Sequence, residues 1–319
     1  MGGLKTSGTA EIGDEHERRF ELFGSQIRLL IGKPVRDGLP TPAAIAIQIE
    51  GLMRAMQRSL SRFDPQSELC ALNADPAESP SVSSMLATAV EAALWAAQRS
   101  DGLIDPVLVD ELEQAGYETS KAGEPPAPIG LALASAPPRR PARPREDAAW
   151  RRISVDRDRG AVTRPPGTRI DTGGTGKGLA ADLATARLDG YATHVVDAGG
   201  DLRIGGDEPL PREVRIEHPL RDELAHSFFV DEGAVATSGV KTRLWRTEAG
   251  FAHHLLDPST GQPAWTGVVQ ATARGNTALE AETLAKMAFL GGPGEAEEIL
   301  GPLGGLVVHD DGSVRLFAT

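Results

Sequence analysis

A glycine-rich stretch near the middle of the sequence carries the residues best suited to bind an anion. It reads RIDTGGTGKGLAAD over 169–182 and holds the adjacent glycines Gly173 and Gly174, followed by Lys177. Glycines let backbone amides approach a ligand because they carry no Cβ. The helix expected over 179–188 adds unpaired N–H groups and the positive end of a dipole, and Lys177 adds a full charge. The stretch favours a phosphate or pyrophosphate; taken alone, it is explained equally well by a tight strand-to-helix connection.

Two better-known phosphate loops do not match this stretch. A Walker loop requires glycine at position 171 and Ser or Thr at position 178, where this sequence has Asp171 and Gly178. The dinucleotide fingerprint G-x-G-x-x-G fits neither this loop nor the later glycine turn at 199–200. Asp171 shifts the balance toward a ligand site, because a carboxylate beside an anion usually serves a metal, a sugar hydroxyl or a base.

Composition limits the classes of protein to consider. The 319 residues are 40% hydrophobic, which predicts a globular chain, and the net charge of −12 argues against non-specific binding of nucleic acid or anionic membranes. The single Cys70 excludes an internal disulfide and a multi-cysteine zinc site. The sequence shows no apolar run near the ~18 residues of a membrane span, no signal core and no lipobox, so we expect a cytoplasmic protein.

Apolar spacing and turn residues predict the elements that must position the loop. Pro42 opens a helix that continues to Leu60 with one apolar face, and a capping pattern follows at Ser67. A second, alanine-rich helix covers about 83–100. The remaining expected elements are a strand at 20–31 interrupted at Gly24-Ser25, strands at 194–196, 212–217, 225–230 and 233–237, and a helix at 278–290.

The chain is expected to form one domain. Residues 1–17 are predicted to be a disordered lead, and residues 18–319 a single unit. The stretch 120–148 is rich in Pro, Ala and Arg and has little periodicity, so it is predicted to be a mobile surface insertion rather than a domain linker.

Seven short motifs occur in one order along the sequence. They are FGS (23–25), SRFDPQSEL..LN (61–73), DGLIDP (101–106), DTGGTGKG (171–178), DAGGD (197–201), ATSG (236–239) and HHLLDPSTGQP (253–263). This series resembles the ApbE family, the FAD:protein FMN transferases. The resemblance implies an α+β, T-fold-like architecture, in which two similar lobes of mixed or antiparallel sheet and flanking helices enclose a FAD cleft.

The resemblance also implies an activity. Members of the family cleave FAD, attach its FMN part through a phosphoester to a Thr or Ser of an acceptor flavoprotein, and release AMP. Magnesium is their usual cofactor. The independent prediction of an anion site around Lys177 agrees with this, because a flavin dinucleotide carries a pyrophosphate.

The resemblance further implies which residues contact FAD. Those expected against the ring systems and the adenosine are Phe23, Phe63, Leu103, Ile104 and Asp105. Those expected near the ribose and phosphates, or along the wall of the cleft, are Asp171, Gly173, Gly174, Lys177, Gly199, Gly200, Asp201, Ser238 and Leu256.

The catalytic residues implied by the family lie near the C-terminus. His254 is expected to take the proton of the attacking hydroxyl, a role that suits a near-neutral imidazole, and Asp257 lies in the corner that follows. Without the family, a histidine packed in a strand is the better explanation of His254.

The sequence departs from the family on its last helix. Where the family has an Asp and a Thr that bind magnesium with a carbonyl of the glycine loop, this chain has Glu282 and Lys286, and the carbonyl belongs to Gly174. An ammonium cannot coordinate a metal. Three interpretations compete: Lys286 supplies the missing charge and is catalytic, a metal binds elsewhere or weakly with Glu282 as ligand, or the two side chains form only an i,i+4 pair.

Because Glu282 and Lys286 differ from the family pattern, three functions remain to be considered. An FMN transferase is the leading hypothesis. The alternatives are a non-catalytic FAD-binding protein, acting as a store or sensor, and a FAD pyrophosphatase that uses water in place of a protein hydroxyl.

Overall fold

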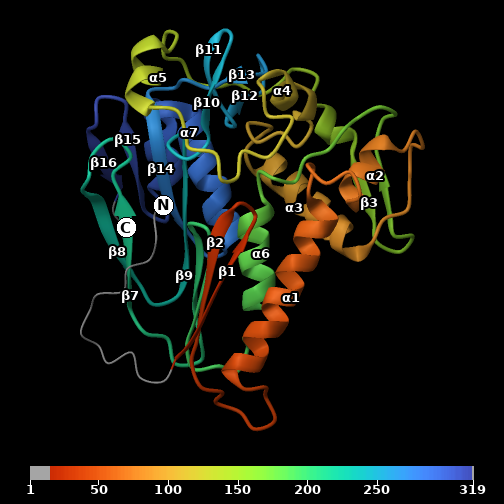
Figure 1. Cartoon of the computed structure of the whole chain (residues 1–319), viewed down its shortest axis with the longest axis vertical. Helices are drawn as coiled ribbons and strands as arrows, with labels where there is room; N and C mark the ends of the chain where they lie inside the picture. The colour runs from red at the N-terminus through yellow and green to blue at the C-terminus, as the bar shows by residue number, and fades with distance from the viewer. Residues whose placement is uncertain (1–14, 318–319) are drawn as a thin grey trace.

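One antiparallel sheet runs through the molecule. The structure, a computed structural model, describes residues 15–317. Its largest sheet has eight strands in the order β1-β2-β5-β6-β9-β14-β15-β16, and every neighbouring pair is antiparallel (Figure 1). The strands are β1 His16–Leu22, β2 Ser25–Ile31, β5 His194–Ala198, β6 Asp201–Gly205, β9 Gly233–Gly239, β14 Val268–Gly275, β15 Gly305–His309 and β16 Val314–Phe317.

Short strand pairs and helices complete the fold. The two-stranded pairs are β3 Ser154–Asp156 with β4 Ala161–Thr163, β7 Arg212–Glu217 with β8 Leu224–Val230, β10 Leu244–Thr247 with β11 Gly250–His253, and β12 Leu256–Asp257 with β13 Gln262–Pro263. The helices are α1 Pro42–Leu60, α2 Glu68–Ala74, α3 Ser84–Arg99, α4 Val109–Gln114, α5 Ile129–Ser135, α6 Gly176–Thr185 and α7 Ala278–Leu300, with a 3-10 turn, η1, at Ala149–Arg152. The expected α+β class is confirmed.

The two faces of the sheet bury different partners. Successive strand residues point to opposite faces, and accordingly Val195 and Val196 of β5 belong to different apolar clusters. Val196 packs with α1, α6 and the first turn of α7, whereas Val195 packs with residues of the β7–β8 hairpin. Helix α7 also runs along β14 and β9, so its first turns lie beside both α6 and the sheet. This is the region in which the predicted site residues meet.

The first helices form where their apolar spacing and caps predict. Thr41 caps α1 by accepting a hydrogen bond from the Ala44 N–H, and Pro42 occupies the first turn, where no N–H is needed. The side chains of Ile49 and Met53 are completely buried on the predicted face. Ser67 and Ser83 cap α2 and α3 in the same way, which confirms the expected capping at Ser67 and the helix near 83–100.

The predicted strand over 20–31 is instead a hairpin. Phe23 and Gly24 have φ angles of 54° and 65°, and two consecutive positive values make the tight turn that reverses an antiparallel pair. The chain therefore turns back at Phe23-Gly24, and β1 pairs with β2 along its whole length. Because β1 begins at His16, the predicted disordered lead of 1–17 extended too far; residues 1–14 lie outside the described part.

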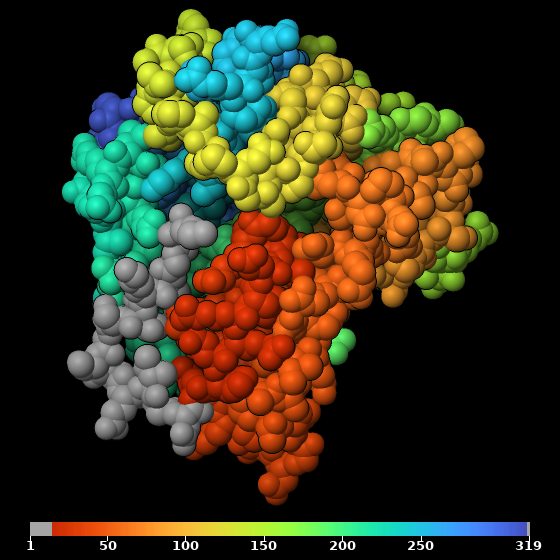
Figure 2. Space-filling view, viewed as in Figure 1, coloured from red at the N-terminus to blue at the C-terminus, as the bar shows by residue number. Residues whose placement is uncertain are grey.

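The Pro/Arg-rich segment 120–148 is anchored, contrary to the predicted mobile insertion. Backbone N–H groups of Ala127, Arg140 and Ala142 donate to the carbonyls of Leu244, Trp265 and Leu290. Helix α5 forms inside the segment, and Ala132 is completely buried. In Figure 2 the segment, in yellow, lies against the tip of the red β1–β2 hairpin, where a Cβ on Gly24 would come within 2.9 Å of the Ala122 Cβ. The segment is thus a strap across this end of the molecule.

Within residues 15–317, none of the helices has the length and apolar character that a membrane crossing requires.

Candidate active site

The glycine loop meets the last helix at a very close approach. A Cβ on Gly178 would lie 2.7 Å from the Ala278 carbonyl oxygen, so only glycine allows this contact. One turn later, Asp182 accepts hydrogen bonds from the N–H groups of Ala278 and Leu279 at 2.8 and 2.9 Å and thereby caps α7. The GKG sequence therefore has a packing reason that the sequence alone did not reveal: it fastens α6 to α7.

Lys177 is partly buried and pairs with the buried Asp201. Its Nζ is 2.6 Å from Asp201 Oδ2 and donates to the Gly199 carbonyl at 3.5 Å. The Lys177 side chain is 24% exposed and that of Asp201 only 1%. Burial lowers the pKa of Lys177, but the carboxylates of Asp201 and Glu282 outweigh burial, and the pKa lies above its usual value. Lys177 is therefore charged at neutral pH.

The glycine turn between β5 and β6 packs against the β1–β2 hairpin. Gly199 and Gly200 have φ angles of 75° and 97°, and a Cβ on Gly199 would lie 2.4 Å from the Ser25 Cβ. Two of the sequence motifs, FGS and DAGGD, are thereby in direct contact. Below the turn, burial raises the pKa of Asp197 to about 6, opposed by the hydrogen bond that it accepts from the Gly200 N–H.

Glu282 and Lys286 form an ion pair on the inner face of α7. Lys286 Nζ donates to Glu282 Oε1 at 2.8 Å, and the Gly178 N–H donates to Glu282 Oε2 at 2.9 Å. The side chains are 1% and 11% exposed, respectively. Burial raises the pKa of Glu282, and the neighbouring Lys286 ammonium opposes that rise. One carboxylate thus joins the last helix to the glycine loop and also fixes the ammonium.

His254 lies in a positive field. Its pKa falls well below 6.5, first because of burial and then because of nearby cationic groups, led by Arg243 and including Lys286 and Lys177. The buried Nδ1 has no hydrogen-bond partner among the described residues. The imidazole is therefore neutral at physiological pH and has a nitrogen able to accept a proton.

Arg243, which sequence reasoning missed, connects this cluster to the β1–β2 turn. Its guanidinium donates to the Tyr117 hydroxyl at 2.5 Å and to the Phe23 carbonyl at 3.3 Å, and its charge acts on His254. The available signal was an arginine directly before the apolar Leu244-Trp245, shortly after the ATSG motif. We name the set Lys177, Asp201, Arg243, His254, Glu282 and Lys286 the polar cluster.

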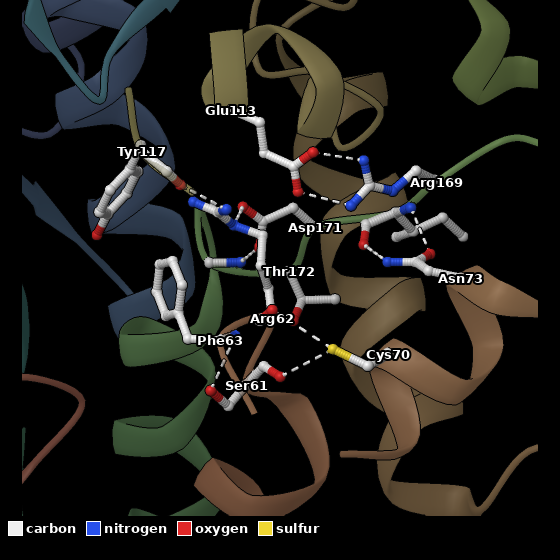
Figure 3. Close-up of polar contacts among 12 residues, drawn as sticks. Ser61, Arg62, Phe63, Cys70, Asn73, Glu113, Tyr117, Arg169, Asp171 and Thr172 are labelled. Atoms are coloured by element: carbon white, nitrogen blue, oxygen red, sulfur yellow. Dashed lines mark hydrogen bonds and ion pairs between the residues drawn. The ribbon is translucent and has the colours of Figure 1, made fainter. Parts of the chain in front are cut away.

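A second missed arginine organises the predicted ring site (Figure 3). The Arg62 guanidinium carbon lies 4.3 Å from the centre of the Phe63 ring and 4.8 Å from that of Tyr117, and Nη1 donates to the Tyr117 carbonyl at 2.7 Å. Arg62 Nε is 3.3 Å from Asp171 Oδ2. The side chain is 5% exposed, and Nη2 is buried without a partner among the described residues. Arg62 therefore ties the aromatic rings to the glycine loop.

Asp171 holds the start of the glycine loop. Its Oδ1 accepts a hydrogen bond from the Gly173 N–H at 2.8 Å, and its own N–H donates to the Pro106 carbonyl at 2.8 Å. The latter bond places the DGLIDP motif beside the loop. Burial raises the pKa of Asp105 to about 6, and its Oδ2 lacks a partner among the described residues.

The remaining residues that were expected to contact FAD lie in different parts of the structure. Leu103 lines a cavity of about 460 Å³ between α3 and α7, together with Leu284 and Met287. Ile104 donates its N–H to the Ser100 hydroxyl. Leu256 and Ser238 are buried, in β12 and β9. From the register, Ser238 lies on the same face of the sheet as Ala236, which pairs with Asp201.

Asp257 accepts hydrogen bonds from its own turn and from the strap. Its Oδ1 accepts hydrogen bonds from the Ser259 N–H at 3.1 Å, the Ser259 hydroxyl at 2.8 Å and the Arg143 N–H at 3.0 Å. This arrangement stabilises the Asp-Pro corner and anchors the strap beside it. The expected catalytic role of Asp257 has no support in these contacts, which are those of a structural residue.

The residues at the expected metal position do not fit magnesium. Both oxygens of Glu282 already accept hydrogen bonds, and the ammonium of Lys286 occupies the place of a neutral ligand. Within residues 15–317 there is also no group of three or more His, Cys, Asp or Glu arranged to hold a metal ion. The roles of Glu282 and the Gly174 carbonyl as metal ligands remain a prediction without structural support.

Comparisons with known proteins agree with the motif series. A model of the ApbE family matches residues 23–307. The FAD:protein FMN transferase of Treponema pallidum is 28% identical over 293 residues, which cover 86% of this chain and 78% of that protein. The FAD:protein FMN transferase of Chlamydia trachomatis is 30% identical over 121 residues, 37% of each chain, so that match spans about a third of the relative.

Solved structures share the fold over nearly the whole chain. The ApbE protein from Thermotoga maritima has a TM-score of 0.76 and 25% identity, and the match covers 95% of this chain and 97% of that one. The flavin transferase ApbE from Vibrio cholerae has a TM-score of 0.71 at 17% identity, with 96% and 97% covered. At that identity, the second likeness shows the fold alone.

Proposed function

The chain belongs to the ApbE family, and from that premise we propose that it transfers FMN from FAD to a Thr or Ser of an acceptor flavoprotein. The observation that carries the proposal is the junction of the glycine loop with the last helix, where the Glu282 carboxylate accepts both the Gly178 N–H and the Lys286 ammonium, and Lys177 pairs with Asp201. Cations at this junction suit the diphosphate of FAD. The negative charge of a bound diphosphate would raise the low pKa of the neighbouring His254 and so favour proton transfer to it from an attacking hydroxyl.

The reaction balances with the residues of the polar cluster. The acceptor hydroxyl oxygen attacks the phosphorus of the FMN half, and its proton passes to the His254 imidazole. The bond between that phosphorus and the bridging oxygen breaks, and AMP departs with the bridging oxygen. Lys177, Arg243 and Lys286 stabilise the negative charge that develops on the phosphate oxygens.

The aromatic side chains of Phe63, Tyr117 and Trp245 also support FAD as the substrate. The Phe63 and Tyr117 rings lie beside each other with centres 5.2 Å apart, and both contact the Arg62 guanidinium. Tyr117 also stacks on Trp245, with ring centres 5.3 Å apart. Flat aromatic and guanidinium surfaces suit the flat ring systems at the ends of a flavin dinucleotide. Arg62 and Asp171 connect these surfaces to the glycine loop, so a single elongated ligand would contact both regions.

The experiment that tests the proposal is mass spectrometry of a candidate acceptor. The purified chain is incubated with FAD and a flavoprotein that carries an exposed Thr or Ser in a modification sequence, and AMP is quantified in parallel. We expect a mass increase of the acceptor equal to FMN minus water, with one AMP released per acceptor. AMP without labelling would indicate a pyrophosphatase, and FAD binding without either product would indicate a non-catalytic binder.

The variant His254→Gln distinguishes an effect on FAD binding from an effect on the rate of FMN transfer. Because a glutamine amide cannot take the hydroxyl proton, we expect about 10²–10⁴-fold slower transfer with little change in FAD affinity. The matched control is His226→Gln on the β7–β8 hairpin, which should label the acceptor at the wild-type rate. Wild-type rates in His254→Gln would remove the imidazole from the mechanism.

A further inference from the structure

The last helix carries a cation where the family pattern has a neutral metal ligand. We propose that the Lys286 ammonium, held by Glu282, takes the place of a divalent metal at the diphosphate site, so that this chain binds and uses FAD without metal. The inference rests on the proposed function for the identity of its substrate. It follows from the poor fit of Glu282 and Lys286 to magnesium and from the position of the ammonium.

The ammonium is fixed in position before any ligand binds. Lys286 Nζ makes one hydrogen bond among the described residues, to Glu282 Oε1 at 2.8 Å, although the side chain is only 11% exposed. An ammonium has three N–H donors, so two remain for phosphate oxygens. A donor held by a buried carboxylate loses little freedom when an anion arrives, which is the arrangement expected of a binding group.

The same carboxylate joins the ammonium to the anion-binding loop. Glu282 Oε2 accepts the Gly178 N–H at 2.9 Å, and Gly178 directly follows Lys177. The two oxygens of one carboxylate thus hold the Lys286 ammonium and the Gly178 N–H, and the charges of both lysines lower the pKa of Glu282. A metal bound to Glu282 would displace one of these donors and face two ammonium groups.

The surroundings of His254 complete the argument. Three cations, Arg243, Lys286 and Lys177, act on this imidazole and lower its pKa. Asp201 and Glu282 already pair with Lys177 and Lys286, so the polar cluster carries a net charge of +1 and offsets one of the two negative charges of a diphosphate diester. The Lys286 ammonium therefore supplies from a side chain part of the positive charge that the family pattern assigns to magnesium.

The first experiment measures FAD binding to metal-stripped protein by flavin fluorescence, in EDTA and in millimolar MgCl2. We expect dissociation constants that agree within about twofold, and transfer to the acceptor that continues in EDTA. Loss of binding or transfer in EDTA, restored by magnesium, would overturn the inference and leave the proposed function intact. Binding in EDTA without transfer under either condition would contradict the proposed function and uphold metal-free binding.

The second experiment replaces the ammonium. Lys286→Met keeps the length of the side chain and removes its charge, and we expect FAD affinity to fall about 10–100-fold in EDTA. Unchanged affinity would overturn the inference. If the single variant fails to fold, Glu282→Gln with Lys286→Met removes the uncompensated carboxylate as well and gives the same reading. Arg54→Met on α1 removes a cation at the same helical spacing and should leave affinity unchanged.

The third experiment restores the family pattern. The double variant Glu282→Asp with Lys286→Thr should acquire a requirement for divalent metal, with FAD affinity at least tenfold higher in magnesium than in EDTA. Direct binding of Mn²⁺, followed by electron paramagnetic resonance, gives a readout that does not depend on activity. We expect Mn²⁺ to bind the double variant and not the wild type; tight binding to the wild type at this helix would overturn the inference.

Discussion

Two ion pairs of this molecule have the same helical geometry and different surroundings. On α1, Arg54 Nη2 lies 2.7 Å from Glu50 Oε1; on α7, Lys286 Nζ lies 2.8 Å from Glu282 Oε1. In both pairs the acid precedes the base by four residues, the favourable order. The Arg54 side chain is 43% exposed and that of Glu50 13%, whereas that of Lys286 is 11% exposed and that of Glu282 1%.

Burial raises the pKa of both carboxyl groups, but the net shifts are opposite in direction. At Glu50 partial burial raises the pKa, but hydrogen bonds from Arg54 and Arg18 outweigh it and hold the pKa below the usual value. At Glu282 burial dominates and the pKa is raised despite the ammonium. The comparison teaches that an i,i+4 pair contributes little to stability at the surface, whereas inside the molecule each partner becomes necessary to the other.

The largest expected effect is on the buried pair. Lys286→Met leaves the Glu282 carboxylate without its ammonium, and we expect the free energy of unfolding to fall by about 3–5 kcal/mol. Urea denaturation followed by circular dichroism measures it. A loss below 1 kcal/mol would mean that the two pairs are equivalent and that burial does not separate them.

Removing both charges should restore most of that loss. In Glu282→Gln with Lys286→Met, no buried charge remains and the glutamine carbonyl still accepts the Gly178 N–H. We expect stability within about 2 kcal/mol of the wild type, because a buried ion pair contributes little net stability. The same urea titration checks this. A double variant no more stable than Lys286→Met would show that the ammonium stabilises by more than compensation of the carboxylate.

Burial of His253, at the end of β11 and beside Phe289 of α7, should also make the free energy of unfolding depend on pH. Burial lowers the pKa of His253 to about 3, so the unfolded chain binds a proton between pH 6.5 and about 3 that the folded chain does not. His253 therefore contributes stability that is present above pH 6.5 and is lost as the pH falls through this window. His253→Phe, which suits the edge-on contacts with Trp265 and Phe289, removes the dependence.

The measurement is the difference in unfolding free energy between wild type and His253→Phe as a function of pH. We expect that difference to change by about 1.4 kcal/mol per unit between pH 6 and 4, in favour of the variant at low pH. Contributions from the buried Asp105 and Asp197 cancel in the difference. Arg54→Met should show the wild-type slope, and equal slopes for His253→Phe would contradict the assignment.

The smallest expected effect is on the exposed pair. Arg54→Met should lower the free energy of unfolding by only about 0.2–0.5 kcal/mol, and the difference should disappear in 1 M NaCl because salt screens exposed charges. Thermal melts at two salt concentrations check this. A larger or salt-insensitive loss would point to the contact of Arg54 with the Phe20 ring, 5.6 Å away, instead of the ion pair.

The helices of this fold were predictable because their signals are local. Thr41, Ser67 and Ser83 cap the helices that the apolar spacing predicts. The β1–β2 hairpin was missed because its turn uses Phe23 at a positive φ, a position where Asn or Gly is the usual signal. The strap was misread because its anchoring depends on backbone bonds to Leu244, Trp265 and Leu290, which no local pattern reveals.

The candidate active site was predictable only in part. The motif series identified Lys177, Asp201 and His254, because glycines and paired histidines mark their positions. Arg62 and Arg243 were missed because their roles arise from contacts between distant segments: Arg62 reaches Tyr117 and Asp171, and Arg243 reaches Phe23. The contacts of a buried arginine are visible only in the structure. In the sequence, its one sign is the apolar residues beside it.

The double fastening of α6 to α7 has a consequence for how this site can change. Gly178 and Asp182 clamp the two helices one turn apart, so the segment beyond Gly178 cannot slide without breaking both attachments. Residues 171–176, upstream of the clamp, are free of that constraint. We therefore expect substitutions that change the accepted nucleotide to occur in residues 171–176. Gly178 and Asp182 should stay the same in proteins that accept different nucleotides.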